Sequence, residues 1–269
     1  MQELQPQRFD GRPPDALEDF LRSMLSHAPE VRTAPALPPH FRAPVGSQGY
    51  RPDLGSFSLD PKPPSLTSER TTHGWRGRFQ SRKGGMAAWR SRLELRLIQL
   101  YETDPDVATF SVRSSILTYT VGARRRRYTP RLVVEKSNER WLVEVGWAQK
   151  VNAPSLRQRW LEVAAAANAL GFGFEVLTEA QLDWQPRARN VIRLLRARRQ
   201  LPIATERSRQ VLAALPKAGL LISELMEELP DLGFKEVTAL ILQGTLAIDL
   251  CRPYQETVRV WPNAHAAAP

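Results

Sequence analysis

Hydrophobic residues recur with a helical period in the centre of the chain. Within residues 86–102 the apolar positions form one stripe, and Glu94 stands beside this stripe at the edge of the buried face. The members of the stripe are Trp89, Leu93, Leu97, Leu100 and Tyr101. The spacing predicts an amphipathic helix that carries a carboxylate at the margin of its apolar face.

Strand-like runs follow this helix. They cover residues 107–112, 115–121, 127–134 and 140–147, with turn residues at Gly122, Ser137 and Asn138. The third and fourth runs are typical of a hairpin. A helical pattern over residues 155–170 and a short apolar run over 172–177 come next. Alternating strand and helix signals predict a mixed α/β unit in which helices cover a sheet.

A different pattern begins after Asp183. The chain becomes helical and rich in arginine to about residue 200, then shows helical patterns at 208–215, 221–229 and 234–243. Two short strand patterns, 246–250 and 257–261, end it, so residues 190–262 are typical of a winged helix. The presumed recognition helix, 234–243, carries one Lys and one Glu. This favours a docking or structural role over sequence-specific DNA reading.

The N-terminal segment has a composition of its own. Residues 1–66 hold 12 of the 22 prolines, which predicts an extended arm. An apolar pattern over residues 17–25, after a possible N-cap at Asp15, predicts a short amphipathic helix within the arm. It could dock on the protein's own core or bind a partner. The predicted organisation is therefore an arm (1–70), an α/β domain (71–183) and a winged-helix-like domain (184–269).

Composition excludes several classes of protein. The 269 residues contain no apolar run of the roughly 20 residues that a membrane span needs, and the start lacks the pattern of a secretory signal. We therefore expect a cytoplasmic protein without a membrane partner. The single cysteine, Cys251, excludes an internal disulfide and a multi-cysteine zinc site, and the four histidines are too scattered to form a zinc site.

Charge points toward a polyanionic partner. The chain has 38 Lys+Arg against 28 Asp+Glu, a net charge of +10, and the arginines gather in two runs. Such runs favour nucleic acid, although excess charge can also serve only solubility. The candidate DNA-binding residues are Arg78, Lys83, Arg124, Arg125, Arg126, Arg127, Arg193, Arg196, Arg198 and Arg199.

The order of carboxylates indicates one kind of chemistry. Glu94 lies on a helix, a strand then ends at residues 128–130, and the next strand carries Glu144. Metal-dependent nucleases hold Mg²⁺ between carboxylates on adjacent strands, with a lysine nearby to position the attacking water.

These segments resemble the TnsA-type endonuclease subunit of heteromeric transposases, a branch of the restriction-endonuclease-like PD-(D/E)xK fold. The resemblance spans about residues 75–182 and leaves residues 1–70 uncovered. The matching segments are 77–83, 89–94, 104–107, 128–130, 141–145 and 174–179, and residues 244–250 with Pro253 resemble the end of the family's winged-helix domain. The resemblance implies a mixed sheet flanked by helices, Glu94 and Glu144 as catalytic positions, Mg²⁺ as cofactor, and transposon ends, a DDE transposase and an AAA+ regulator as partners.

Two departures from the family change this expectation. Arg131 stands where the family has a metal-binding Asp, and Gly146 stands where it has the Lys. A permanent cation 3–4 Å from a metal ion costs on the order of several kcal/mol. We therefore expect Arg131 to pair with Glu94, Glu144 or both, and we expect no metal cofactor.

Further departures make the same region more positive. Arg113 and Ser114 replace a Gln-Pro pair of the family, and Arg90 replaces a Glu. An active metal centre would need Glu135 in place of the missing Asp and Lys136 or Lys150 in place of the missing Lys. Glu135 lies four residues beyond Arg131 on one strand, about 13 Å away, which is too far to ligate the same ion.

The sequence thus predicts a DNA-binding, catalytically degenerate TnsA-like transposition protein that acts as an assembly factor at transposon ends. One alternative is an active metal-dependent endonuclease that cuts the 5′ strand there and uses Mg²⁺. The other is a DNA-binding regulator outside transposition.

Overall fold

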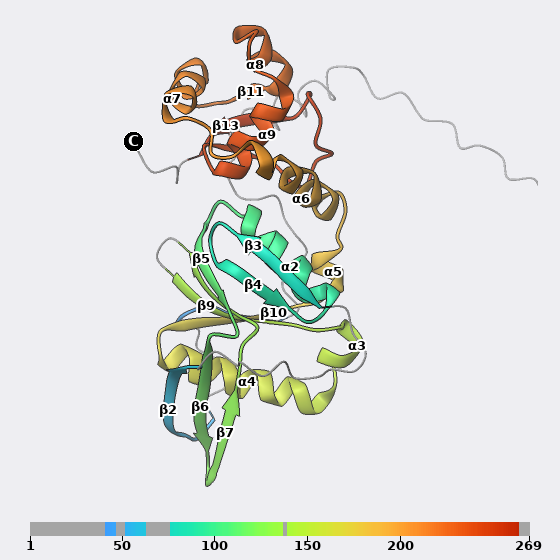
Figure 1. Ribbon diagram of the computed structural model, residues 1–269. Helices are drawn as coiled ribbons and strands as arrows, with labels where there is room; N and C mark the ends of the chain where they lie inside the picture. Colours follow the sequence, from blue (N-terminus) through green and yellow to red (C-terminus); the bar gives the residue numbers. More distant parts are fainter. Residues whose placement is uncertain (1–40, 47–51, 63–75, 137–138, 264–269) are drawn as a thin grey trace, which may run out of the picture. The chain divides into compact units, whose positions relative to one another are not determined.

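The largest sheet is mixed and joins strands that are far apart in the sequence. The computed structural model describes residues 41–46, 52–62, 76–136 and 139–263 (Figure 1). Five strands pair in the order β1 (Phe41–Ala43), β10 (Phe172–Leu177), β9 (Glu139–Val145), β8 (Leu132–Lys136) and β5 (Val107–Val112). β10 runs parallel to β9, and the other pairs are antiparallel. All six residues of β10 are buried, as expected for a strand with both faces covered.

Helices cover the two faces of this sheet. α2 (Arg92–Thr103) packs on one face and α4 (Pro154–Ala169) on the other. Successive side chains of a strand point to opposite faces, and β9 shows this directly. Trp141 and Val143 belong to the core with α2, whereas Leu142 belongs to the core with α4. The prediction of a mixed α/β sheet flanked by helices is confirmed.

Smaller sheets complete this region. One has the strand order β2 (Leu54–Pro61), β6 (Ser115–Val121) and β7 (Arg124–Tyr128), and another is the hairpin of β3 (Gly77–Ser81) and β4 (Gly85–Trp89). β1 and β2 fall inside the stretch predicted as an extended arm, so that prediction is wrong for residues 41–43 and 54–61. Each finds a distant partner, β10 or β6, and a proline occurs only at the last position of β2. The predicted helix at 17–25 lies outside the described residues.

Two predicted elements have different bounds. Residues 77–89 form a hairpin, so the helix predicted over 86–102 begins later; β4 starts at Gly85, whose φ is +64°. Helix α2 begins at Arg92 because the Ser91 side chain caps it by accepting a hydrogen bond from the Glu94 N–H. The strand predicted at 127–134 is broken between β7 and β8, where Pro130 has no N–H to donate.

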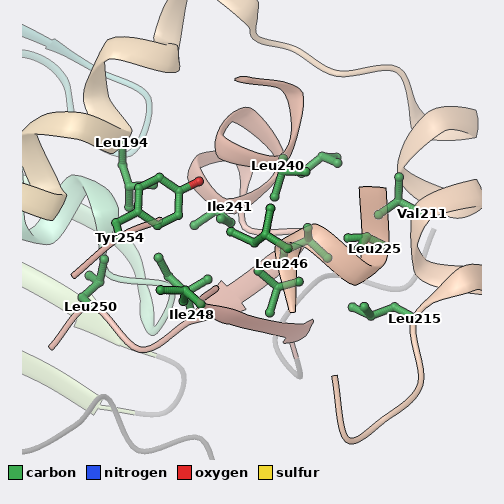
Figure 2. Packing of buried hydrophobic residues seen from close by; sticks show 14 of the residues in the cluster. Leu194, Val211, Leu215, Leu225, Leu240, Ile241, Leu246, Ile248, Leu250 and Tyr254 are labelled. Carbon is green, nitrogen blue, oxygen red and sulfur yellow. The ribbon is translucent and has the colours of Figure 1, made fainter. Parts of the chain in front are cut away.

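The C-terminal residues form helices around a small sheet. In this sheet residues 259–262 pair antiparallel with residues 220–221 on one side and with residues 246–248 on the other, and the strands near 246–250 and 257–261 were predicted. The remaining elements are α3 (Ala148–Val151), α5 (Glu179–Leu182), α6 (Arg187–Arg196), the 3-10 helix η1 (Ala197–Gln200), α7 (Thr205–Ala214), β11 (Leu220–Leu221), α8 (Ile222–Glu228), α9 (Phe234–Gln243), β12 (Leu246–Ile248) and β13 (Arg259–Pro262). Figure 2 shows their shared core, in which Leu194, Leu240 and Tyr254 are almost fully buried.

The C-terminal core meets the α2 core through two leucines. Leu100 of α2 and Leu195 of α6 each pack against both clusters. All the described residues belong to one compact unit. α2 and α6 are therefore neighbours, and Arg198 of η1, which donates to the Gln80 carbonyl, connects the β3–β4 hairpin to the same region.

Candidate functional site

Glu94 is fixed by the start of its own helix. Its backbone N–H donates to Ser91 Oγ at 3.1 Å, and its Oε2 accepts from the Arg90 N–H at 2.7 Å. The residue is only 7% exposed. A buried carboxylate needs such partners, so the cap that starts the helix also orients the acid.

Glu144 is held in a similar way on β9. The Tyr128 hydroxyl donates to Glu144 Oε2 at 2.7 Å, and the Val145 N–H donates to Oε1 at 2.9 Å. Burial, together with the neighbouring carboxylate, raises the pKa of Tyr128 well above its usual value. Tyr128 therefore remains a neutral hydrogen-bond donor to Glu144 at physiological pH.

The Arg131 side chain connects the two carboxylates. Its Nε donates to Glu144 Oε1 at 2.7 Å, and its Nη1 lies 3.3 Å from Glu94 Oε1. Burial by itself lowers the pKa of Arg131, but the attraction of Glu144 and Glu94 outweighs it and the pKa is raised. The guanidinium is thus a fixed cation between both acids, and the predicted pairing of Arg131 with Glu94 and Glu144 is confirmed.

A second guanidinium reaches Glu94 from the turn between β5 and β6. Arg113 Nη2 contacts the same Oε1 atom that Arg131 approaches, while the Arg113 N–H donates to the Arg131 carbonyl at 3.0 Å. Among the described residues, Arg113 is the one non-glycine with a positive φ, +49°. Backbone in this region is costly for a residue with a Cβ. Sequence reasoning noted Arg113 as a departure but gave no sign of this pairing.

Gly146 leaves no space for the lysine of the nuclease pattern. A Cβ at Gly146 would lie 2.8 Å from Val151 Cγ1, so a larger side chain requires Val151 to move. The Gly146 N–H donates to the Leu177 carbonyl at 3.1 Å and fixes this part of the backbone beside β10.

The residues considered as substitutes for the missing Asp and Lys lie away from Arg131. Glu135 accepts from Thr109 Oγ1 at 2.8 Å, and Lys136 Nζ lies 5.4 Å from the centre of the Tyr101 ring. Both side chains are at the end of β8 remote from Arg131. Lys150 is exposed on the short helix α3.

This centre does not fit a divalent metal ion. Two carboxylates face two guanidiniums, so their formal charges sum to zero before any metal enters. In the part of the chain that the structure describes, no group of three or more His, Cys, Asp or Glu side chains is placed to hold a metal. An added Mg²⁺ would meet the Arg131 and Arg113 cations directly. What the arrangement does supply is an ion-pair network around two buried carboxylates that ties α2, β9 and the β5–β6 turn together.

The arginines of β7 occupy an edge strand. Strand β7 pairs only with β6 in its sheet, and charged residues on such edges prevent pairing with other chains. Arg126 Nη1 lies 2.9 Å from the buried Glu162 carboxylate, whereas Arg124, Arg125 and Arg127 are exposed. These three residues thus have a structural role that does not need DNA.

The remaining DNA-binding candidates fall into two groups. Lys83 is engaged inside the protein: its Nζ donates to the Tyr101 carbonyl at 3.3 Å and to that of Asp104, and burial lowers its pKa. Arg78 is exposed on β3. Arg193, Arg196 and Arg199 are exposed along α6 and η1, and Arg198 is half-buried there.

Three further arginines lie on or beside α6. Arg189 is on α6 itself, four residues before Arg193, and it belongs to the second arginine run of the sequence. Arg82 and Arg96 come from the β3–β4 turn and from α2, and only the fold places them near α6.

Comparisons with known proteins add no relative. No family model matches the chain, and no curated protein matches it. Within the described ranges, every helix is too short or too polar to cross a bilayer.

Proposed function

We propose that this chain is a DNA-binding, TnsA-like transposition protein in which a restriction-endonuclease-like scaffold has lost its catalytic centre. It acts at transposon ends as an assembly factor with a DDE transposase and an AAA+ regulator. The observation that carries the proposal is the position of the Arg131 guanidinium between Glu94 and Glu144.

The convergence of the two acids supports the scaffold. They are 50 residues apart, on a helix and on a strand, and a nuclease of this kind needs both beside one metal ion. Here one side chain contacts both. Because Arg131 also satisfies two buried carboxylates, its removal leaves acids that repel each other, so the centre now stabilises the fold.

The C-terminal elements support a winged helix. The order α7, β11, α8, α9, β12, β13 with a β11-β13-β12 sheet is that of helix, strand, two helices and two wing strands. In α9 every residue from 237 to 242 is buried, which leaves few side chains to reach base edges. This supports a docking or structural role for the winged helix rather than DNA reading.

Metal binding and strand cleavage test the proposal together. Calorimetric titration with Mg²⁺ and Mn²⁺ compares the wild type with Arg131→Asp, which restores the acid, and with Arg131→Gln, which only removes the cation. We expect no binding heat for the wild type, binding by Arg131→Asp, and weaker or no binding by Arg131→Gln. A supercoiled plasmid carrying the transposon ends should remain intact with the wild type in either metal.

Placing the lysine of the nuclease pattern at residue 146 requires a second substitution, at Val151. Gly146→Lys alone meets Val151, so the restored centre is Arg131→Asp, Gly146→Lys and Val151→Ala together. Nicking by this triple variant would give direct support for a nuclease scaffold. Nicking by the wild type that disappears in Glu94→Ala would instead show an active endonuclease. A gene neighbourhood without transposase and ATPase genes would favour a regulator outside transposition.

A further inference from the structure

A groove lined by arginines runs along α6 and η1. It consists of two hollows, of about 1010 Å³ and about 490 Å³, and Arg196 lines both. The β3–β4 turn and Gln243 at the end of α9 contribute to the larger one, and Arg96 of α2 contributes to the smaller one. The arginines of the groove are Arg82, Arg96, Arg189, Arg193, Arg196, Arg198 and Arg199.

The positive charge of the groove is not balanced within its lining. Seven arginines line the two hollows, and no Asp or Glu is among the lining residues of either. One of the seven, Arg96, is paired with an acid outside the lining, since its Nε lies 3.5 Å from Asp183 Oδ1. The degenerate centre differs, because there Arg113 and Arg131 are paired with Glu94 and Glu144. A surface of this kind attracts a polyanion.

Four of the arginines form a row. Arg189, Arg193, Arg196 and Arg199 follow one another at intervals of three or four residues, and all are exposed. At 1.5 Å per residue the row is about 15 Å long. Duplex DNA carries about nine phosphate charges along that length of its axis.

Some of these side chains build the wall of the groove and others remain available. Arg82 Nη1 donates to the Leu242 carbonyl at 2.6 Å, Arg193 Nη1 donates to the Tyr254 carbonyl at 2.7 Å, and Arg198 donates to the Gln80 carbonyl. Within the described ranges, the side chains of Arg189, Arg196 and Arg199 form no hydrogen bond or ion pair. Fixed cations beside unengaged ones suit a ligand that presents several phosphates.

The lining favours nucleic acid over an acidic protein. Protein interfaces have an apolar core, whereas phosphate contacts need only charge and hydrogen-bond donors. The apolar side chains Ile192, Leu195 and Leu201 of the lining are half-buried. The large hydrophobic side chains exposed in the described part of the chain are Val45, Phe57, Met86 and Trp147, and none of them lines the groove.

We infer that this groove binds the phosphate backbone of duplex DNA without reading its bases. The inference rests on the proposed function only in taking DNA as the partner. It places the contact on α6 and η1, not on β7 or in the degenerate centre.

A charge-matched pair of variants tests the inference on the full chain. Arg189→Gln, Arg196→Gln and Arg199→Gln together remove three exposed charges from the groove, and Arg124→Gln, Arg125→Gln and Arg127→Gln together remove three from β7. Each variant lowers the net charge from +10 to +7. Binding of a fluorescent 30-base-pair duplex of arbitrary sequence is measured by anisotropy at several salt concentrations, and thermal unfolding confirms that both variants fold.

The groove variant should bind the duplex at least about tenfold more weakly. Its slope of log affinity against log salt should fall by about 2.7, since each lost phosphate contact removes about 0.9. The β7 variant should keep the wild-type slope.

Three other outcomes would contradict either the groove inference or the proposed function. Loss of binding in the β7 variant alone would overturn the groove inference and leave DNA binding standing. Displacement of the duplex by polyglutamate at equal charge concentration would assign the groove to an acidic protein and overturn the inference. A wild type that binds no duplex even at low salt would contradict the proposed function itself.

Discussion

Arg113 combines an unfavourable backbone conformation with a stabilising ion pair. Its φ of +49° is unfavourable for a side chain with a Cβ, yet this conformation directs its guanidinium to Glu94. Burial lowers the pKa of Arg113, and its buried Nε atom has no hydrogen-bond partner among the described residues. The ion pair with Glu94 offsets these costs.

The backbone cost at Arg113 can be measured by a matched pair of variants. Arg113→Gly and Arg113→Ala both lose the ion pair, but only Ala retains a Cβ at positive φ. We expect the Gly variant to be more stable than the Ala variant by about 1 kcal/mol in urea unfolding. At the neighbouring Ser114 the order should reverse, because its φ is not positive. Equal stability of the two Arg113 variants would show that the turn relaxes.

At the scale of elements, the contact between β9 and β10 organises the main sheet. The two strands are parallel and in register over six residue pairs, and Gly173 stands opposite Trp141. A Cβ at Gly173 would lie 2.6 Å from Trp141 Cε3, and Trp141 is only 1% exposed. A glycine in a buried strand is therefore required here by the approach of an indole ring.

Gly173→Ala should destabilise the protein because neither the strand nor the buried indole can move freely. We expect a loss of about 2 kcal/mol in the free energy of unfolding. Gly55→Ala, at an exposed position of β2, is the control, since a Cβ there meets only the Thr120 side chain at 3.4 Å, and its effect should stay within about 0.5 kcal/mol. Trp141→Phe should partly restore the stability of Gly173→Ala. A free energy of unfolding for Gly173→Ala equal to that of the wild type would contradict the close approach of Trp141 to Gly173.

At the scale of the whole molecule, a few side chains connect the central sheet region to the C-terminal helices. Arg82 of the β3–β4 turn donates to the Leu242 carbonyl at 2.6 Å and to the Gln243 carbonyl at 3.5 Å. These carbonyls belong to the last turn of α9, where no intrahelical donor remains for them. Arg82, in the β3–β4 turn, therefore caps the C-terminal end of α9.

Arg82→Ala should weaken this connection. We expect a loss of about 1 kcal/mol in the free energy of unfolding and faster hydrogen exchange in the last turn of α9. Arg78→Ala on the same hairpin is the control and should change neither quantity. Unchanged exchange in Arg82→Ala would show that Gly244, with its φ of +89°, ends the helix without help.

The sequence by itself determined the elements with strong local periodicity. The strands at 107–112, 115–121 and 172–177 and the helix at 234–243 have their predicted bounds, because alternation and apolar spacing are properties of neighbouring residues. The pairing of Arg131 with Glu94, Glu144 or both was expected because the TnsA-type resemblance implied that the three residues share one centre, where two acids without a metal ion require another cation.

Only the tertiary structure decided what depends on distant partners. β1 and β2 are strands because β10 and β6 pair with them, although the local composition is rich in proline. The pairing of Arg113 with Glu94 depends on the positive φ of Arg113 and on the packing of α2 beside the β5–β6 turn, neither of which a local pattern indicated. The arginine groove joins residues from α2, the β3–β4 turn and α6. Long-range pairing brings such residues together, and a local reading of sequence does not contain that information.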